Sequence, residues 1–206
     1  MKLLGICGSH SEQSRTLVAV AKTLDFAKEW EKSLSIETVN IRDYDIPFCD
    51  SRDPQLYEGD AKKIISKFIK CDGLIVGTPI YRGAYTGILK NLFDIIPNDS
   101  IQGKPVGILV TGKTDHHYLS IEHMIKPLIG FFHAHVIPGA VYINHRHYVE
   151  DELVDQGTLI RLKELAKAVV EFTRQLPPDL FNLVGPPGPD IRKSSPAPSK
   201  KIANKQ

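Results

Sequence analysis

Residues 3–16 read Leu3-Leu4-Gly5-Ile6-Cys7-Gly8-Ser9-His10-Ser11-Glu12-Gln13-Ser14-Arg15-Thr16, and this stretch decides the fold. Its apolar first part predicts a strand over residues 2–7, which leads into a loop rich in hydroxyl side chains. Beyond the loop, apolar residues recur at spacings of three and four and predict a helix over residues 14–32. The chain therefore opens with a strand, a polar loop and the N-terminus of a helix.

This arrangement is typical of a phosphate-binding site. Unpaired backbone N–H groups and the positive end of the helix dipole both face an anion at a helix N-terminus. Ser9, Ser14 and Thr16 add hydroxyl donors, and Arg15 adds a positive charge. We therefore expect the loop to hold a mononucleotide phosphate.

The remaining pattern alternates strands with helices. A Pro-containing loop, with Pro47 and Pro54, follows the second predicted strand, and Pro138 in the fifth strand places that strand at a sheet edge. Pro127 is expected to kink the fourth helix. The other strands are expected at 34–41, 73–78, 106–110 and 136–143, and the other helices around 64–69 and 88–96 and over 119–132 and 151–176.

Five strands that alternate with helices predict an α/β fold, a doubly wound parallel sheet with helices on both faces. We expect the strand order 2-1-3-4-5. In such sheets the ligand lies beyond the carboxyl ends of the strands, where the strand order reverses. The loops after strands 1, 3 and 4 should therefore meet around one ligand.

The two later loops favour a flat ring. After strand 3, Pro79 fixes the chain direction, Tyr81 offers an aromatic face and Gly83 allows close backbone approach. After strand 4, the small polar run 111–114 can hydrogen-bond a ring edge. The first loop lacks the Gly-x-Gly-x-x-Gly spacing of a dinucleotide site, so these features together favour FMN.

Three segments carry a family resemblance: GSHSEQSRT at 8–16, CDGLIVGTPIYRGAYTGILKNLFDIIP at 71–97, and the Thr-Gly-Lys loop at 111–113. The chain resembles the flavodoxin-like NAD(P)H-dependent FMN reductases over residues 1–172. It is most similar to the branch that supplies reduced FMN to alkanesulfonate monooxygenases. The resemblance implies an oxidoreductase that transfers hydride from nicotinamide C4 to flavin N5, with FMN and NAD(P)H as cofactors and no catalytic side chain.

The resemblance also implies a role for each matching residue. Ser9, Ser14, Arg15 and Thr16 would bind the FMN phosphate. The ribityl chain and isoalloxazine would contact Pro79, Tyr81, Arg82 and Gly83, and the pyrimidine edge would face Thr111, Gly112 and Lys113.

Two positions, Tyr85 and Lys113, bear on the oligomeric state and on the properties of the bound flavin. In the resembling branch, an inserted tyrosine forms a π-bulge in the helix after strand 3 and lies at a tetramer interface, and Tyr85 occupies that place. The resemblance therefore implies a homo-oligomer, a tetramer or a dimer. Lys113 replaces a glycine that is usual in the family. Its bulk could crowd the flavin, its charge could stabilise reduced flavin, or its side chain could point to solvent.

The composition argues against several other classes of protein. A net charge of +2 over 206 residues offers no basic block for nucleic acid. Three widely spaced cysteines exclude a disulfide framework and a zinc-ribbon site. The chain has no apolar run of membrane length and no signal peptide, so we expect a cytoplasmic protein.

The histidines allow a second interpretation, a metal site. His133 with His135, and His145 with His147, would each lie on one face of an extended chain. No carboxylates accompany them at ligand spacing. We therefore expect no metal, and instead expect His116 or His117 to line the mouth of the cofactor cleft.

The chain divides into a domain over residues 1–176 and a Pro- and Lys-rich extension over 177–206, expected to be partly mobile. Four apolar residues at 180–184 in that extension could dock on the domain or on a neighbouring subunit.

The sequence leaves two other functions open. One is an electron carrier that retains its flavin and uses no NAD(P)H. The other is a quinone, azo or metal-ion reductase on the same scaffold. The choice between NADH and NADPH, and between retained and released FMN, is not encoded in any motif that we identify.

Overall fold

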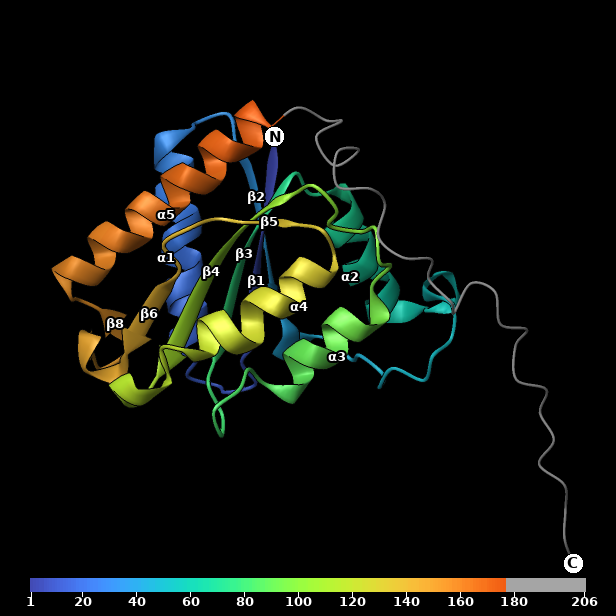
Figure 1. The fold of residues 1–206 in the computed structure, drawn as a ribbon, viewed down its shortest axis with the longest axis horizontal. Helices are drawn as coiled ribbons and strands as arrows, with labels where there is room; N and C mark the ends of the chain where they lie inside the picture. The colour runs from blue at the N-terminus through green and yellow to red at the C-terminus, as the bar shows by residue number, and fades with distance from the viewer. Residues whose placement is uncertain (177–206) are drawn as a thin grey trace, which may run out of the picture.

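A computed structural model describes residues 1–176 and shows a parallel sheet with helices on both faces (Figure 1). The strands that form the sheet are β1 (Lys2–Cys7), β2 (Ser35–Asn40), β3 (Gly73–Pro79), β4 (Pro105–Gly112), β5 (His135–Val136) and β6 (Val141–Asn144). The α-helices are α1 (Arg15–Trp30), α2 (Gly59–Lys70), α3 (Gly87–Ile95), α4 (Lys126–Phe131) and α5 (Gln156–Gln175). The predicted extension over 177–206 lies outside the described residues.

The predicted strand order is confirmed. The sheet runs β2-β1-β3-β4-β5, and every pairing in it is parallel. The order reverses between β1 and β3, so the loops that follow these two strands flank the predicted ligand position.

Alternating strand residues divide the core into two layers. Leu3, Ile75 and Leu109 pack with α1 and α5 on one face, whereas Leu4 and Val76 pack with α2, α3 and α4 on the other. Figure 1 shows the same division, with α1 and α5 together on one side of the sheet. Because both faces are covered, β1, β3 and β4 are almost wholly apolar.

Two strand glycines bring α1 close to the sheet. A Cβ on Gly77 would lie 2.4 Å from Val20 Cγ2, and one on Gly5 would lie 2.6 Å from Leu24 Cδ1. A larger residue at either position would therefore push α1 outward, together with the loop at its N-terminus.

The fifth strand was predicted as one piece over 136–143, which is wrong. Two short strands, β5 and β6, both pair with β4. Pro138 lies between them and has no N–H for the ladder, and Gly139 adopts a left-handed φ of 86°. The chain therefore leaves the sheet and returns to it.

The fourth helix also differs from the prediction. A π-helical turn over Ile121–Ile125 precedes α4, and the Lys126 N–H donates to the Ile121 carbonyl, five residues earlier. Pro127 lies in the first turn of α4. Since Pro127 cannot donate to residue 123, the regular ladder is broken at the predicted kink position.

The fifth helix begins later than predicted. A two-stranded hairpin, β7 (Tyr148–Val149) and β8 (Glu152–Leu153), precedes it, and β8 lies where the helix was expected to start. Asp155 then caps α5, because its carboxylate accepts the Thr158 N–H at 2.7 Å. The hairpin lies beside the N-terminus of α1 and contributes to the site described next.

Candidate functional site

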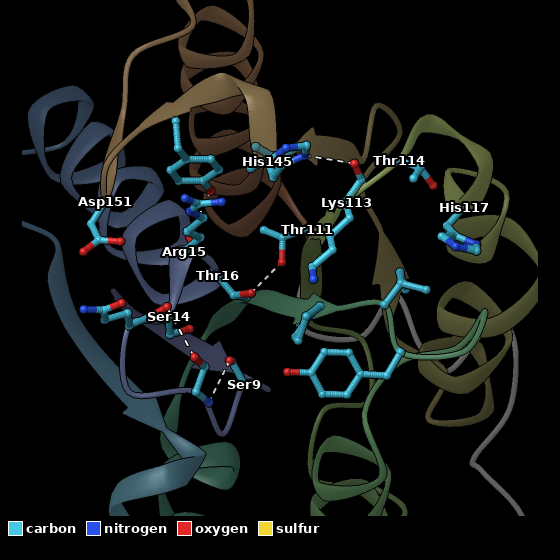
Figure 2. Close-up of a pocket in the computed structure, with 18 of the residues that line it drawn as sticks. Ser9, Ser14, Arg15, Thr16, Thr111, Lys113, Thr114, His117, His145 and Asp151 are labelled. Carbon is cyan, nitrogen blue, oxygen red and sulfur yellow. Dashed lines mark hydrogen bonds between the residues drawn. The ribbon is translucent and has the colours of Figure 1, made fainter.

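The loop after β1 ends at a capped helix N-terminus. Ser14 is the N-cap of α1, and its hydroxyl oxygen accepts the Leu17 N–H at 3.1 Å. The Ser9 hydroxyl oxygen accepts the Ser11 N–H at 3.2 Å, which folds the loop over the helix end. Both serines are buried, yet both line a cleft (Figure 2). Their hydroxyl hydrogens can therefore donate to a ligand there.

Arg15, in the first turn of α1, is held from the side by the β7–β8 hairpin. The ring of Tyr148 lies 5.5 Å from the guanidinium carbon, and an Arg15 Nη donates to the Glu150 carbonyl at 3.1 Å. The Tyr148 hydroxyl donates to the Arg15 carbonyl at 2.9 Å. Arg15 thus reaches the cleft with its guanidinium over an aromatic ring.

The loop after β3 forms a tight hairpin. Tyr81 and Ala84 exchange two backbone hydrogen bonds, of 2.8 and 3.2 Å. Between them, Arg82 and Gly83 have left-handed φ values of 56° and 87°, the pattern of a type I′ turn, which favours glycine at its second position. The Gly83 carbonyl accepts the Ser120 hydroxyl at 2.9 Å, so the hairpin is anchored to the segment before the π-helical turn.

The loop after β4 closes the opposite side. The hydroxyls of Thr111 and Thr16 lie 2.6 Å apart. The Lys113 carbonyl is 2.9 Å from His145 Nδ1, and the Lys113 side chain points into the cleft (Figure 2). Lys113 is thus an exposed residue whose side chain lines the cleft.

Together these segments line one cleft of about 670 Å³ at the carboxyl ends of β1, β3 and β4. This volume is within the range of about 300–1,000 Å³ that is usual for small-molecule sites. The cleft brings together all but one of the predicted cofactor-binding residues, namely Ser9, Ser14, Arg15, Thr16, Pro79, Tyr81, Arg82, Thr111, Gly112 and Lys113. Gly83 is the exception; it shapes the hairpin behind Arg82.

Sequence reasoning missed part of the lining. Tyr148 and Asp151 come from the unpredicted hairpin, and His145 follows β6. His117, which we expected at the cleft mouth, does line it. One sequence feature could have predicted this. Asp155 is a favourable N-cap residue, and starting the helix there would have left residues 148–153 free to be predicted as a hairpin.

The predicted π-bulge at Tyr85 is wrong. Tyr85 lies ahead of α3, because Thr86 is the N-cap and its hydroxyl oxygen accepts the Leu89 N–H at 3.3 Å. The same hydroxyl donates to the Gly8 carbonyl at 2.6 Å. This tie to the first loop fixes where α3 begins, so Tyr85 cannot interrupt the helix.

The cleft is mainly positive. Arg15, Arg82 and Lys113 line it, and Asp151 is the acidic side chain among the lining residues. Burial raises the pKa of the Tyr148 phenol, so it stays neutral and keeps its hydrogen for the Arg15 carbonyl. This balance suits an anionic ligand.

Two other features are absent from residues 1–176. No three His, Cys, Asp or Glu side chains gather there in a way that could hold a metal ion. No helix in that part of the chain is long and apolar enough to cross a membrane.

Comparison with known proteins gives consistent matches. The sequence model of a family described as NADPH-dependent FMN reductase matches residues 1–148. An NAD(P)H-dependent FAD/FMN reductase of Geobacillus thermodenitrificans is 40% identical over 84% of this chain and 93% of its own length. The NADH-dependent FMN reductase SfnF of Pseudomonas putida is 27% identical over 84% and 92%. An oxidoreductase structure from Corynebacterium diphtheriae has a TM-score of 0.73 at 22% identity, covering 85% of this chain and 98% of that one, and supports the fold.

Proposed function

The chain belongs to the NADPH-dependent FMN reductase family, and we propose that its cleft holds FMN with the phosphate at the N-terminus of α1. It is an NAD(P)H-dependent oxidoreductase that reduces flavin. The observation that carries the proposal is that polar donors and apolar residues line different ends of one cleft. Hydroxyl and guanidinium donors lie at the α1 end, whereas Pro79, Ile80 and Tyr81 lie beyond them.

The donor set at the α1 end fits a phosphate. Ser9, Ser14 and Thr16 supply hydroxyl groups, Arg15 supplies a planar cation, and the helix dipole adds to their field. The loops after β3 and β4 supply an aromatic side chain, backbone polar groups and the Lys113 ammonium for a flat ring system. The residues present therefore match both ends of FMN.

When bound, FMN would supply the redox chemistry, which is acceptance of a hydride from nicotinamide C4 at flavin N5. The protein contributes binding, orientation and electrostatics. Lys113 would place a positive charge where reduced flavin gains negative charge. No side-chain acid or base is required for this step, and we assign no catalytic residue.

We further propose that reduced FMN leaves for a partner flavin-dependent monooxygenase or another acceptor. Support comes from the resemblance to the sulfonate-linked branch. An electron carrier would instead retain FMN and oxidise no NAD(P)H, and a quinone, azo or metal-ion reductase would turn over with such an acceptor.

A homo-oligomer, a dimer or a homotetramer, is also proposed. Tyr85 lines an apolar hollow beside α3 and α4 with Phe93, Met124, Leu128 and Phe131. Phe131 is 60% exposed in the single chain, and such patches are typical of protein interfaces. Sedimentation velocity should show a dimer or tetramer that Phe131→Glu dissociates. Phe172→Glu, on α5, is the control; a monomeric wild-type protein would contradict this proposal.

Steady-state oxidation of NADH and of NADPH, with and without added FMN, tests the main proposal. We expect turnover that requires FMN and an Arg15→Ala variant whose half-saturating FMN concentration rises about tenfold or more. Lys163→Ala removes the same charge from an exposed position of α5 and should leave that concentration unchanged. Turnover by the flavin-free protein without added FMN, or equal FMN dependence of the two variants, would refute the assignment.

A further inference from the structure

The β7–β8 hairpin makes three contacts with a single residue of the proposed phosphate site. The Tyr148 ring makes a cation–π contact with the Arg15 guanidinium, and the Tyr148 hydroxyl donates to the Arg15 carbonyl at 2.9 Å. The Glu150 carbonyl accepts from an Arg15 Nη at 3.1 Å. The hairpin thus fixes both the main chain and the side chain of Arg15.

The hairpin is itself firmly anchored. The His147 carbonyl, just before β7, accepts the Val154 and Asp155 N–H groups at 3.0 and 3.2 Å. His147 Nδ1 lies 2.9 Å from the Thr158 hydroxyl in the first turn of α5. Tyr148 is only 7% exposed. The contacts on Arg15 therefore come from a rigid support.

The turn of the hairpin carries backbone strain. Glu150 is a non-glycine residue with a left-handed φ of 52°, a conformation that costs about 1–2 kcal/mol in an L-residue. Glu150 stands at the turn, and its carbonyl is the one that receives the guanidinium. Such strain is often found at functional sites.

These contacts leave the guanidinium able to bind an anion. The Glu150 carbonyl is the hydrogen-bond acceptor found for it among residues 1–176, while arginine has five N–H donors. Arg15 also lines the cleft. A side chain that is already held in place loses less conformational freedom when a ligand binds.

We propose that Tyr148 is a positioning residue, which acts through Arg15 to make the cleft select phosphorylated flavin over unphosphorylated flavin. The inference rests on the proposed function, because it assumes that the FMN phosphate lies at the N-terminus of α1. It adds a residue of the hairpin to the recognition of that phosphate. If Tyr148 only connected α1 to the hairpin, replacing it would change the affinities for FMN and riboflavin equally.

Titration of the full-length protein with FMN and with riboflavin, followed by flavin fluorescence, separates these possibilities. Tyr148→Phe keeps the ring and removes the hydroxyl that holds the Arg15 carbonyl. We expect FMN affinity to fall about three- to tenfold, the worth of one hydrogen bond, and riboflavin affinity to change less than about twofold.

Tyr142→Phe is the matched control. The Tyr142 hydroxyl donates to the Thr114 carbonyl at 2.5 Å, in the loop after β4, so this variant also removes one tyrosine-to-backbone hydrogen bond. Because Thr114 lies at the proposed ring end, any change should be equal for the two flavins. In an Arg15→Ala background, Tyr148→Phe should have no further effect on FMN affinity.

The outcomes are distinct. Unchanged selectivity in Tyr148→Phe, or an effect that persists in Arg15→Ala, would overturn the positioning role while leaving the FMN site intact. A wild-type protein that binds FMN no more tightly than riboflavin would overturn the proposed phosphate site, and with it this inference. Thermal unfolding of each variant without flavin checks that the fold is retained.

Discussion

The hydroxyl oxygens of Thr16 and Thr111 lie 2.6 Å apart, and this hydrogen bond joins the first turn of α1 to the end of β4. Both side chains are buried, with exposed fractions of 2% and 8%. The bond therefore links the proposed phosphate end of the cleft directly to its ring end.

Replacing either threonine by valine should leave the other hydroxyl buried without its partner. Each single variant is expected to lose about 1–3 kcal/mol of unfolding free energy. The double variant should lose less than the sum, since neither hydroxyl then remains. Urea unfolding of all four proteins measures this coupling; additive losses would show that the two hydroxyls do not depend on each other.

Lys113→Gln should lower the midpoint potential of bound FMN. Its ammonium faces the cleft and favours the more negative, reduced flavin. The expected decrease is about 20–40 mV, or about 1–2 kcal/mol for a two-electron couple. Spectroelectrochemical titration provides the measurement, with Lys163→Gln as the control outside the cleft. An unchanged potential together with an unchanged FMN affinity would reject this role.

Asp151→Asn should tighten FMN binding. Asp151 follows Glu150 in the hairpin turn and lines the cleft near Arg15, so its carboxylate opposes a phosphate there. Removing the charge should raise FMN affinity by about two- to fivefold at low salt, with a smaller gain at high salt. Riboflavin serves as the internal control; an equal gain for riboflavin would disprove the electrostatic explanation.

Glu37 should contribute stability that depends on pH. It bridges Lys2 on β1 and Lys67 on α2, and its hydrogen bonds to these ammonium groups lower its pKa below the usual 4.5. A lowered pKa means that the contribution is complete above pH 4.5 and is lost as the pH falls below it.

Glu37→Gln is therefore expected to cost about 1 kcal/mol at pH 7, with a deficit that shrinks in acid. Denaturant unfolding at several pH values tests this expectation. Glu29→Gln, at an exposed position of α1, is the control. A deficit that stays constant down to low pH would contradict the ion-pair origin.

Thiol reagents should distinguish the three cysteines. Cys7 and Cys71 are buried and Cys49 is only partly so, and burial raises the pKa of Cys7 and raises that of Cys71 to about 11. We expect one rapidly reacting thiol in the native protein, lost in Cys49→Ala, and three in denaturant. Rapid reaction of a second native thiol would show that a buried segment opens.

Local patterns in the sequence predicted the sheet order and most of the cleft. The apolar runs of β1, β3 and β4 and the loops after them are contiguous in sequence, and parallel topology brings their carboxyl ends together. This is why the sequence alone predicts that Ser9, Pro79 and Thr111 lie near one another, as they do in the cleft.

The remaining features depend on contacts between distant segments. Tyr148 meets Arg15 across 133 positions of chain, and no local pattern encodes that pairing. The hydrogen bond from the Thr86 hydroxyl to the Gly8 carbonyl fixes the start of α3 after Tyr85. Tyr85 therefore lies outside the helix and forms no bulge in it. Pro138 correctly predicted that the fifth strand lies at the sheet edge, but Pro138 itself lies between β5 and β6. The length of this interruption depends on how each of the two strands pairs with β4.

The split edge of the sheet has a further consequence for how the chain behaves at high concentration. β5 pairs with β4 over two residues and β6 over four, with Pro138 and Gly139 between them. An incoming strand from another molecule would therefore find only short, misaligned runs of backbone donors and acceptors. Such interrupted edges resist edge-to-edge aggregation, so this edge of the sheet is a poor template for pairing with another copy of the chain.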